Sequence, residues 1–231
     1  MQTRLTETLL REGAAAVGFA DISELPEEER HGFKYAVSIV VTLKPEIVRS
    51  IAGGPNHAYC QEYKRTNNLL SELGRCAVHY LEQHGYSAMP LKPTGEDFDK
   101  KTLSAGLSHK AVATRAGLGW IGKSALLITE QFGAAFRLNS VLTEAPFESA
   151  GPVNESRCAE CVACVKACPG QAILNRNWQA GLAREALLDA GRCYQTANNY
   201  AKSLQIDSTI CGVCIAACPW TKKFLSRENR F

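Results

Sequence analysis

The sequence predicts an α+β protein: an α/β sandwich domain over residues 1–148, followed by a smaller domain over residues 149–231. Three observations support this division. Apolar, β-branched runs such as 36–43 alternate with helical patterns in the first part. A Pro- and Gly-containing segment at 146–152 reads as a linker. Eight of the ten cysteines follow residue 157, so the character of the chain changes there.

The first half of the sandwich domain begins with an amphipathic helix over residues 1–13, whose leucines lie on one side. Residues 16–22 and 36–43 are rich in apolar and β-branched side chains, which favours strands. Apolar residues then recur at the helical period from 58 to 84. Gly85 is suited to end that helix. We therefore expect two strands followed by one long helix.

The second half of the domain continues the mixture. Its expected elements are a short strand at 86–91, a polar loop at 93–101 and a helix capped by Ser108 and ending at Gly117. Residues 124–129 and 136–142 are apolar enough to form a strand pair joined through Gly133.

The bulk composition is that of an ordinary globular protein, with 45% hydrophobic and 21% charged residues. The net charge of +3 gives no strong electrostatic reason to expect a nucleic-acid or membrane partner. No apolar stretch reaches the roughly 18 residues of a spanning helix. The N-terminus has no apolar core of a secretory signal. We therefore expect a cytoplasmic protein.

The cysteines form two related runs. The first is Cys158-x2-Cys161-x2-Cys164-x3-Cys168-Pro169, and the second is Cys211-x2-Cys214-x3-Cys218-Pro219, with Cys193 upstream. The first run matches the bacterial two-cluster ferredoxin pattern, in which the fourth cysteine ligates the other cluster. This predicts two 4Fe–4S clusters in a ferredoxin-like domain. The predicted ligands are Cys158, Cys161, Cys164 and Cys218 for one cluster, and Cys168, Cys193, Cys211 and Cys214 for the other.

A pair of structural zinc sites is the alternative, because C-x2-C pairs also form zinc ribbons. Zinc does not explain the longer run that ends in Cys-Pro, so the spacing favours clusters. Cys193 is assigned partly by elimination. Cys60 and Cys76 lie on the predicted long helix, where we interpret them as small buried hydrophobes.

A glycine segment, Gly117-Leu-Gly-Trp-Ile-Gly-Lys-Ser124, fits both G-x-G-x-x-G and the P-loop pattern. Both motifs need a strand before the glycines and a helix after them. Here a helix precedes the glycines and an apolar strand follows, so we reject nucleotide binding. Trp120 and Ile121 instead indicate a surface that packs against something flat and apolar.

The stretch AVATRAGLGWIGKSALL, the following FGAAFRLNSVLT segment and the double cysteine run ending in ACPW resemble the epoxyqueuosine reductase family. That family is cobalamin-dependent, carries two 4Fe–4S clusters and is distantly similar to reductive dehalogenases. The resemblance is to a short form without the C-terminal helical-repeat domain. It implies a corrinoid-binding first domain in which the glycine segment lies against the corrin. The implied cofactor contacts are Gly117, Gly119, Trp120, Gly122 and Lys123.

The resemblance also exposes a departure at the proposed proton donor. The family has an Asp at the position where this chain has Leu103. His109 and Tyr63 are the alternative candidates, because His109 begins the helix beside the glycine segment and Tyr63 lies near a family Asp-Tyr-His stretch. His109 also has an alternative interpretation, as a capping or packing histidine near the start of the helix.

The favoured function is a cobalamin-binding iron–sulfur reductase whose clusters deliver electrons to a corrinoid, for reduction of a substrate other than tRNA. The expected partners are an electron donor such as a ferredoxin or flavodoxin and a small-molecule or corrinoid-protein acceptor. Two alternatives stay open. One is an electron carrier or corrinoid-reducing accessory protein without substrate chemistry of its own. The other is reduction of epoxyqueuosine in tRNA, for which the basic residues Lys222, Lys223, Arg227 and Arg230 are the only support.

Overall fold

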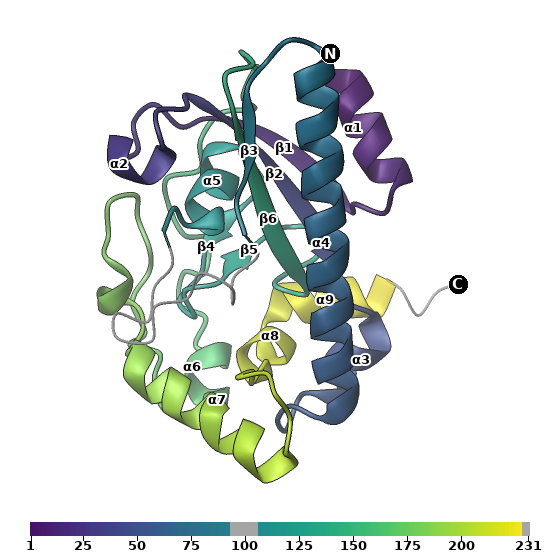
Figure 1. Ribbon diagram of the computed structural model, residues 1–231. Helices are drawn as coiled ribbons and strands as arrows, with labels where there is room; N and C mark the ends of the chain where they lie inside the picture. Colours follow the sequence, from purple (N-terminus) through teal and green to yellow (C-terminus); the bar gives the residue numbers. More distant parts are fainter. Residues whose placement is uncertain (93–105, 228–231) are drawn as a thin grey trace. The chain divides into compact units, whose positions relative to one another are not determined.

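The structure, a computed structural model, describes residues 1–92 and 106–227 (Figure 1). The chain divides into two compact units, each built from several segments. Unit 1 comprises residues 1–42, 66–118 and 137–153, and unit 2 comprises residues 43–65, 119–136 and 154–231.

These units do not follow the single boundary predicted after residue 148. Residues 43–65 and 119–136 belong with the cysteine-dense region, although they lie in the first half of the chain. The long helix α4 (His57–Gln83) begins in unit 2 and continues in unit 1. Local patterns report the type of each element and carry no information on which segments fold together, so a contiguous division was expected.

Unit 1 is built on a four-stranded sheet with the strand order β1-β2-β6-β3. Strands β1 and β2 are antiparallel, with Ala16 opposite Val40, and β3 is antiparallel to β6, with Ala88 opposite Thr143. The elements of this unit besides α4 are α1 (Gln2–Arg11), β1 (Ala16–Asp21), α2 (Glu27–Arg30), β2 (Tyr35–Thr42), β3 (Ala88–Pro90), α5 (His109–Arg115) and β6 (Phe136–Thr143).

Each face of this sheet buries its own apolar cluster, because successive side chains of a strand point to opposite faces. Val37, Ile39 and Val41 of β2 pack with leucines of α1 and α4. Ala36 packs on the other face with α5 residues such as Val112. The predicted first helix, strands 16–22 and 36–43, long helix and helix after Ser108 are thus confirmed (Figure 1).

The predicted pairing of residues 124–129 with 136–142 is wrong. Strand β5 (Leu127–Ile128) pairs with β4 (Trp120–Ile121), and β6 pairs with β3. A tight turn explains the difference, because the Ala125 N–H donates to the Gly122 carbonyl and Ala125 has a positive φ of 55°. The turn folds 120–128 into a local hairpin. The predicted polar loop at 93–101 lies outside the described residues.

Unit 2 consists mainly of short helices. Besides the first part of α4 and the β4–β5 hairpin, its elements are α3 (Pro45–Ser50), α6 (Ala163–Ala167), the 3-10 helix η1 (Arg184–Ala186), α7 (Ala190–Leu204), α8 (Val213–Ala217) and α9 (Pro219–Arg227). The buried Glu62 carboxylate accepts hydrogen bonds from the Lys44 N–H and the Arg65 guanidinium, which ties the start of α4 to the start of α3. None of the helices in the described part of the chain is long and apolar enough to cross a membrane.

Candidate metal centre

The two cysteine runs adopt the same local structure. Helices α6 and α8 have five residues each, and each ends at a cysteine that precedes proline. Cys168 and Cys218 are the respective C-caps, with extended φ/ψ values of −67°/112° and −63°/128°. The two helices pack against each other. The two related cysteine runs of the sequence therefore form a structural repeat.

One set of thiols surrounds Cys164. Burial, followed by the nearby thiols of Cys158, Cys218 and Cys161, raises the pKa of Cys164 to about 11. Cys218 comes from the second run and is buried, and Cys158 also acts to raise its pKa. The chain thus brings Cys218 to the three cysteines of the first run.

A second set surrounds Cys193 and Cys214. Burial is the largest cause that raises the pKa of both thiols, and Cys211 and Cys168 add to it in both cases. Cys164, from the other set, also raises the pKa of Cys214. Cys193 is supplied by the first turn of α7, where Asp189 caps the helix by accepting a hydrogen bond from the Arg192 N–H. This grouping agrees with the crossover rule, and the exact ligands of each cluster stay a prediction. Each set draws cysteines from separate stretches of the chain.

The donor chemistry of these sets fits 4Fe–4S clusters. Buried neighbouring thiols with raised pKa values do not ionise together unless a cation compensates their charge. Cluster iron supplies that compensation, because thiolates are its ligands. Among residues 1–92 and 106–227, no three His, Cys, Asp or Glu side chains converge closely enough to hold a single metal ion. Four thiols for each of two clusters account for all eight cysteines after residue 157.

Close packing holds the second cysteine run in place at two points. Gly212, with φ of +84°, approaches Ile51 so closely that a Cβ there would lie 2.6 Å from its Cδ1 atom. After Cys218, the Thr221 hydroxyl accepts a hydrogen bond from the Ala134 N–H at 2.9 Å. A Cβ at Gly133 would lie 2.2 Å from the Thr221 nitrogen. Sequence reasoning missed Thr221, for which the only signal was its position three residues after Cys218.

The glycines at 117, 119 and 122 are each explained by a contact within the protein. A Cβ at Gly119 would lie 2.1 Å from the Ile128 carbonyl oxygen, and one at Gly122 would lie 2.4 Å from the Ile128 side chain. Gly117 has φ of +72° and meets the carbonyl oxygen of Gly151. These close approaches require glycine whether or not a cofactor binds. Contact of this segment with a corrin stays a prediction.

Trp120 and Lys123 are both buried in unit 2. The Trp120 ring is 1% exposed, lies edge-on to Trp220 with 5.2 Å between ring centroids, and has the Arg157 guanidinium 5.4 Å above it. Lys123 is 4% exposed and donates to Asn175 Oδ1 at 3.0 Å. Sequence analysis did not single out Trp220 or Arg157, although each lies within two residues of a predicted cysteine ligand.

His109 lies in unit 1 with both ring nitrogens engaged. Nε2 is 3.0 Å from the Lys92 carbonyl oxygen and Nδ1 is 3.0 Å from Ser140 Oγ. A carbonyl only accepts, so Nε2 carries the proton and Nδ1 accepts from the serine hydroxyl. Burial lowers the pKa of His109 to about 4, and the charges of Arg137 and Lys110 act in the same direction. This geometry gives His109 a structural role in joining α5 to β6.

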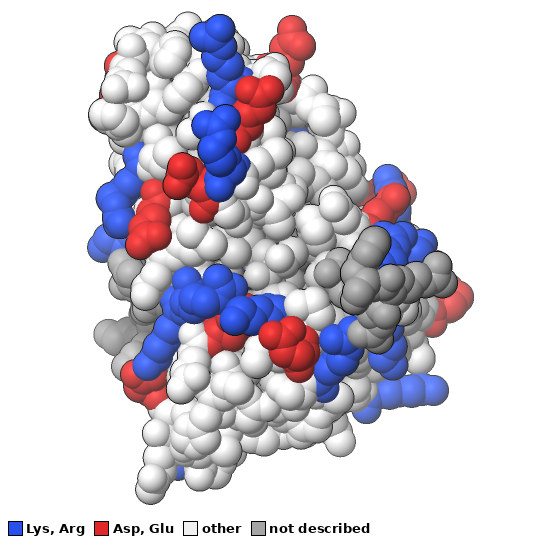
Figure 2. Space-filling model, turned by 90° about the vertical axis from the view of Figure 1, so that its right-hand side faces the viewer, with Lys and Arg blue, Asp and Glu red and all other residues white. Residues whose placement is uncertain are grey.

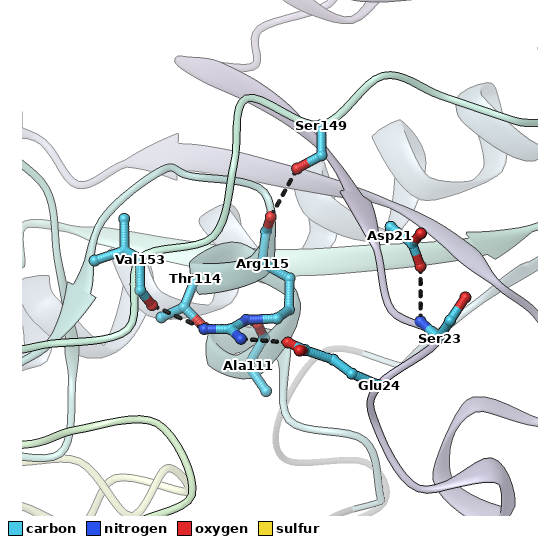
Figure 3. Close-up of polar contacts among 8 residues, drawn as sticks. All are labelled: Asp21, Ser23, Glu24, Ala111, Thr114, Arg115, Ser149 and Val153. Carbon is cyan, nitrogen blue, oxygen red and sulfur yellow. Dashed lines mark hydrogen bonds and ion pairs between the residues drawn. The ribbon is translucent and has the colours of Figure 1, made fainter.

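The C-terminal end of α5 is joined to the segment 149–153 through Arg115 (Figure 3). The buried guanidinium donates to the Val153 carbonyl at 2.9 Å and pairs with Glu24. The Ser149 hydroxyl donates to the Arg115 carbonyl at 2.9 Å. These contacts position the chain where it leaves α5 for the glycine segment and where it approaches the first cysteine run.

The remaining candidates are dispersed. Tyr63 is half-buried on the part of α4 that belongs to unit 2, so no described unit contains both Tyr63 and His109. Cys60 is buried, and its Sγ atom lies 3.7 Å from Asp207 Oδ1. Cys76 packs against the apolar cluster of unit 1, and burial raises its pKa. Leu103 lies outside the described residues.

Comparison with known proteins agrees with this geometry. Residues 157–221 match the model of the 4Fe-4S double cluster binding domain. Over 185 residues the chain is 31% identical to an epoxyqueuosine reductase of Aliivibrio fischeri. The match covers 73% of this chain and 44% of that protein. The chain thus spans less than half the length of this curated relative.

Two solved structures share the fold over most of the chain. An epoxyqueuosine reductase with a tRNA stem loop superposes with a TM-score of 0.65 and 20% identity, covering 96% of this chain and 65% of that one. A reductive dehalogenase superposes with a TM-score of 0.68 and 17% identity, covering 94% of this chain and 32% of that one. Residues 157–221 therefore form a 4Fe–4S double-cluster binding domain, in a chain similar to epoxyqueuosine reductases in sequence and fold and to reductive dehalogenases in fold.

Proposed function

We propose that this protein is an iron–sulfur reductase that binds cobalamin and uses its two clusters to deliver electrons to it. The observation that supports the proposal is a 4Fe-4S double-cluster domain match, with Cys218 close to the cysteines of the first run, in a chain similar to an epoxyqueuosine reductase. The dehalogenase with the same fold is described in terms of B12-dependent dehalogenation. Bound cobalamin would supply a low-valent metal that the protein's own residues do not offer.

The contribution of this chain is to hold the clusters and to limit solvent around them. The thiols are half-buried or buried, and the Trp120–Trp220 pair adds apolar cover beside the first set. Burial and hydrogen bonding to sulfur are among the factors that set a cluster's potential. One such bond is present, because the Ala172 N–H lies 3.4 Å from Cys168 Sγ. These features favour electron storage and transfer as the role of unit 2.

The neutral state of His109 narrows the choice of proton donor for substrate reduction. A neutral imidazole with both nitrogens engaged is a poor general acid near neutral pH. Tyr63 remains the candidate donor. The weakness of His109 also favours the alternative function, an electron carrier or corrinoid-reducing accessory protein that needs no proton donor.

We propose a small molecule or a corrinoid protein as the acceptor. On the face shown in Figure 2, Lys and Arg side chains lie in small groups with Asp and Glu among them. Nucleic-acid sites usually gather positive charge on one surface, so this face gives no support to a tRNA substrate. Epoxyqueuosine in tRNA is retained as one of the acceptors in the test.

The test begins with binding. Protein reconstituted anaerobically with iron and sulfide is titrated with cobalamin, followed by visible and paramagnetic resonance spectra. Saturable binding with changed cobalt spectra is expected. Intact clusters with no cobalamin binding would refute the proposed function and leave an electron carrier.

Turnover is then measured with halogenated compounds, epoxides, an epoxyqueuosine-containing stem loop and a second corrinoid protein. If Tyr63 is the general acid, Tyr63→Phe should slow turnover by roughly 10²–10⁴. Tyr59→Phe, which removes a hydroxyl from the same helix, should not. Electron transfer to the corrinoid protein alone, unaffected by Tyr63→Phe, would favour the accessory role.

A further inference from the structure

The β4–β5 hairpin carries two buried donors with too few acceptors. The Lys123 ammonium has three N–H groups, but within the described part of the chain its hydrogen-bond acceptor is Asn175 Oδ1 alone, and no carboxylate pairs with it. The Trp120 Nε1–H is buried, and among those residues it has no acceptor at all. A buried cation with one neutral partner is costly unless negative charge lies nearby. We therefore expect a negatively charged group close to this hairpin.

The neighbour indicated by the packing of unit 2 is the first cysteine set. A Cβ at Gly122, next to Lys123, would lie 3.4 Å from Cys158 Sγ. Trp120 is covered by Arg157, which precedes Cys158, and it packs on Trp220, two residues after Cys218. The hairpin therefore packs beside Cys158 and beside a residue that follows Cys218, two members of this set from different cysteine runs. A cluster held by four thiolates carries negative charge, and reduction adds one more.

We propose that Lys123 is the counter-charge of the cluster held by Cys158, Cys161, Cys164 and Cys218, and that it raises the reduction potential of that cluster. A positive charge stabilises the reduced form more than the oxidised form, because the reduced form is more negative. Burial limits the screening that weakens surface charges. The Trp120 N–H acts in the same sense by donating toward cluster sulfur. Lys123 is a tuning residue and touches no substrate.

This inference rests on the two-cluster assignment and is independent of cobalamin. It also separates Lys123 from the nucleotide-binding role that its sequence motif suggests, and from the corrin contact that the family resemblance implies. Lys123 should affect one cluster and leave the other unchanged. That selectivity makes the inference testable within a single protein.

The experiment is a redox titration of the reconstituted full chain, with the reduced clusters measured by paramagnetic resonance after iron content has been checked. The signal of the first cluster is identified as the one lost in Cys161→Ala. In Lys123→Gln, we expect the reduced-to-oxidised ratio of this cluster at fixed potential to fall on the order of tenfold. For a one-electron couple that is about 59 mV. Lys123→Arg should restore most of the ratio.

Asn175→Asp provides a second route that leaves Lys123 in place. Asn175 is exposed and has φ of +55°, a region that Asp tolerates, so this variant should fold even if Lys123→Gln does not. The new carboxylate would neutralise Lys123 and lower the same ratio by a smaller factor. Lys202→Gln, an exposed charge on α7, is the matched control and should have no effect.

Three results would overturn the inference. The first is an unchanged potential of the first cluster in both Lys123→Gln and Asn175→Asp. The second is an equal shift of both clusters. The third is a shift in Lys202→Gln as large as that in Lys123→Gln. Failure of cobalamin to bind would refute the proposed function without affecting any of these measurements.

Discussion

In unit 1 the buried side chains are arranged by a four-stranded sheet with an apolar cluster on each face, whereas in unit 2 the two cysteine runs lie on and around helices of five residues. Helices this short are not stable on their own. In unit 2 the predicted cluster ligands would join distant segments, in addition to contacts such as the hydrogen bond from the Ala134 N–H to the Thr221 hydroxyl. The comparison teaches that one chain combines a fold specified by apolar periodicity with a fold specified by ligand spacing.

The two units also differ in net charge. Unit 1 has 11 Lys and Arg against 14 Asp and Glu, a net charge of −3. Unit 2 has 15 against 9, a net charge of +6. Each predicted cluster with its four thiolates would carry a net negative charge, because the iron ions offset only part of the charge of the thiolates and sulfides. The positive side chains of unit 2 would offset part of that charge.

Removal of iron should produce the largest difference between the two units. With an anaerobic chelator, we expect amide exchange to become fast in α6 and α8 while β2 and β6 stay protected, because metal binding contributes directly to folding. Helix α4 offers an internal control, since protection should be lost before residue 65 and kept after it. Uniform loss of protection along the whole chain would show that the units do not fold independently.

Acid should destabilise unit 1 through His109. Its folded pKa of about 4 lies below the ordinary value of 6.5, so the unfolded chain binds the proton more readily. The stabilising contribution is complete above about pH 6.5 and is lost as the pH falls toward 4. Between pH 7.5 and 5.0 the free energy of unfolding should fall by about 2 kcal/mol from this group.

Urea unfolding of wild type and His109→Gln at the two pH values isolates this term, because all other titrating groups are common to both proteins. Gln retains a donor for the Lys92 carbonyl. An equal pH dependence in the two proteins would contradict the assignment of His109 as a buried, neutral side chain.

A smaller effect is expected at the contact between α5 and the segment 149–153. Arg115→Met removes the hydrogen bond to the Val153 carbonyl and should cost about 1–2 kcal/mol. Glu24→Gln should cost less than about 1 kcal/mol, because the Glu24 side chain is 59% exposed and the pair is screened. Thermal unfolding of both variants measures the difference, and a larger loss in Glu24→Gln would be the contrary result.

Prediction from sequence succeeded where the signal was local. The apolar periodicities of 36–43 and 58–84 predicted β2 and α4, and the cysteine spacing predicted the double-cluster domain that residues 157–221 match. The place of β6 between β2 and β3 was missed because both pairings join distant residues, about 50 positions apart for β3. The neighbours of Trp120 were missed for the same reason, since Arg157 and Trp220 come from distant segments.

The glycine segment shows a different kind of limit. Its pattern fits nucleotide-binding motifs, but the structure explains its glycines by the close approach of Ile128 and Gly151. A pattern of small residues records that backbone must approach something closely, and it does not identify what approaches. Only the helix before the segment and the hairpin after it separate these possibilities.

The central claim is that two 4Fe–4S clusters are held by crossed sets of cysteines, and ligand substitution tests it most directly. Anaerobically reconstituted protein should contain about eight irons and eight acid-labile sulfides per chain. Cys218→Ala and Cys161→Ala should abolish the same paramagnetic signal, while Cys168→Ala and Cys211→Ala should abolish the other. Two zinc ions per chain without labile sulfide, or loss of the Cys211 signal in Cys218→Ala, would contradict the claim.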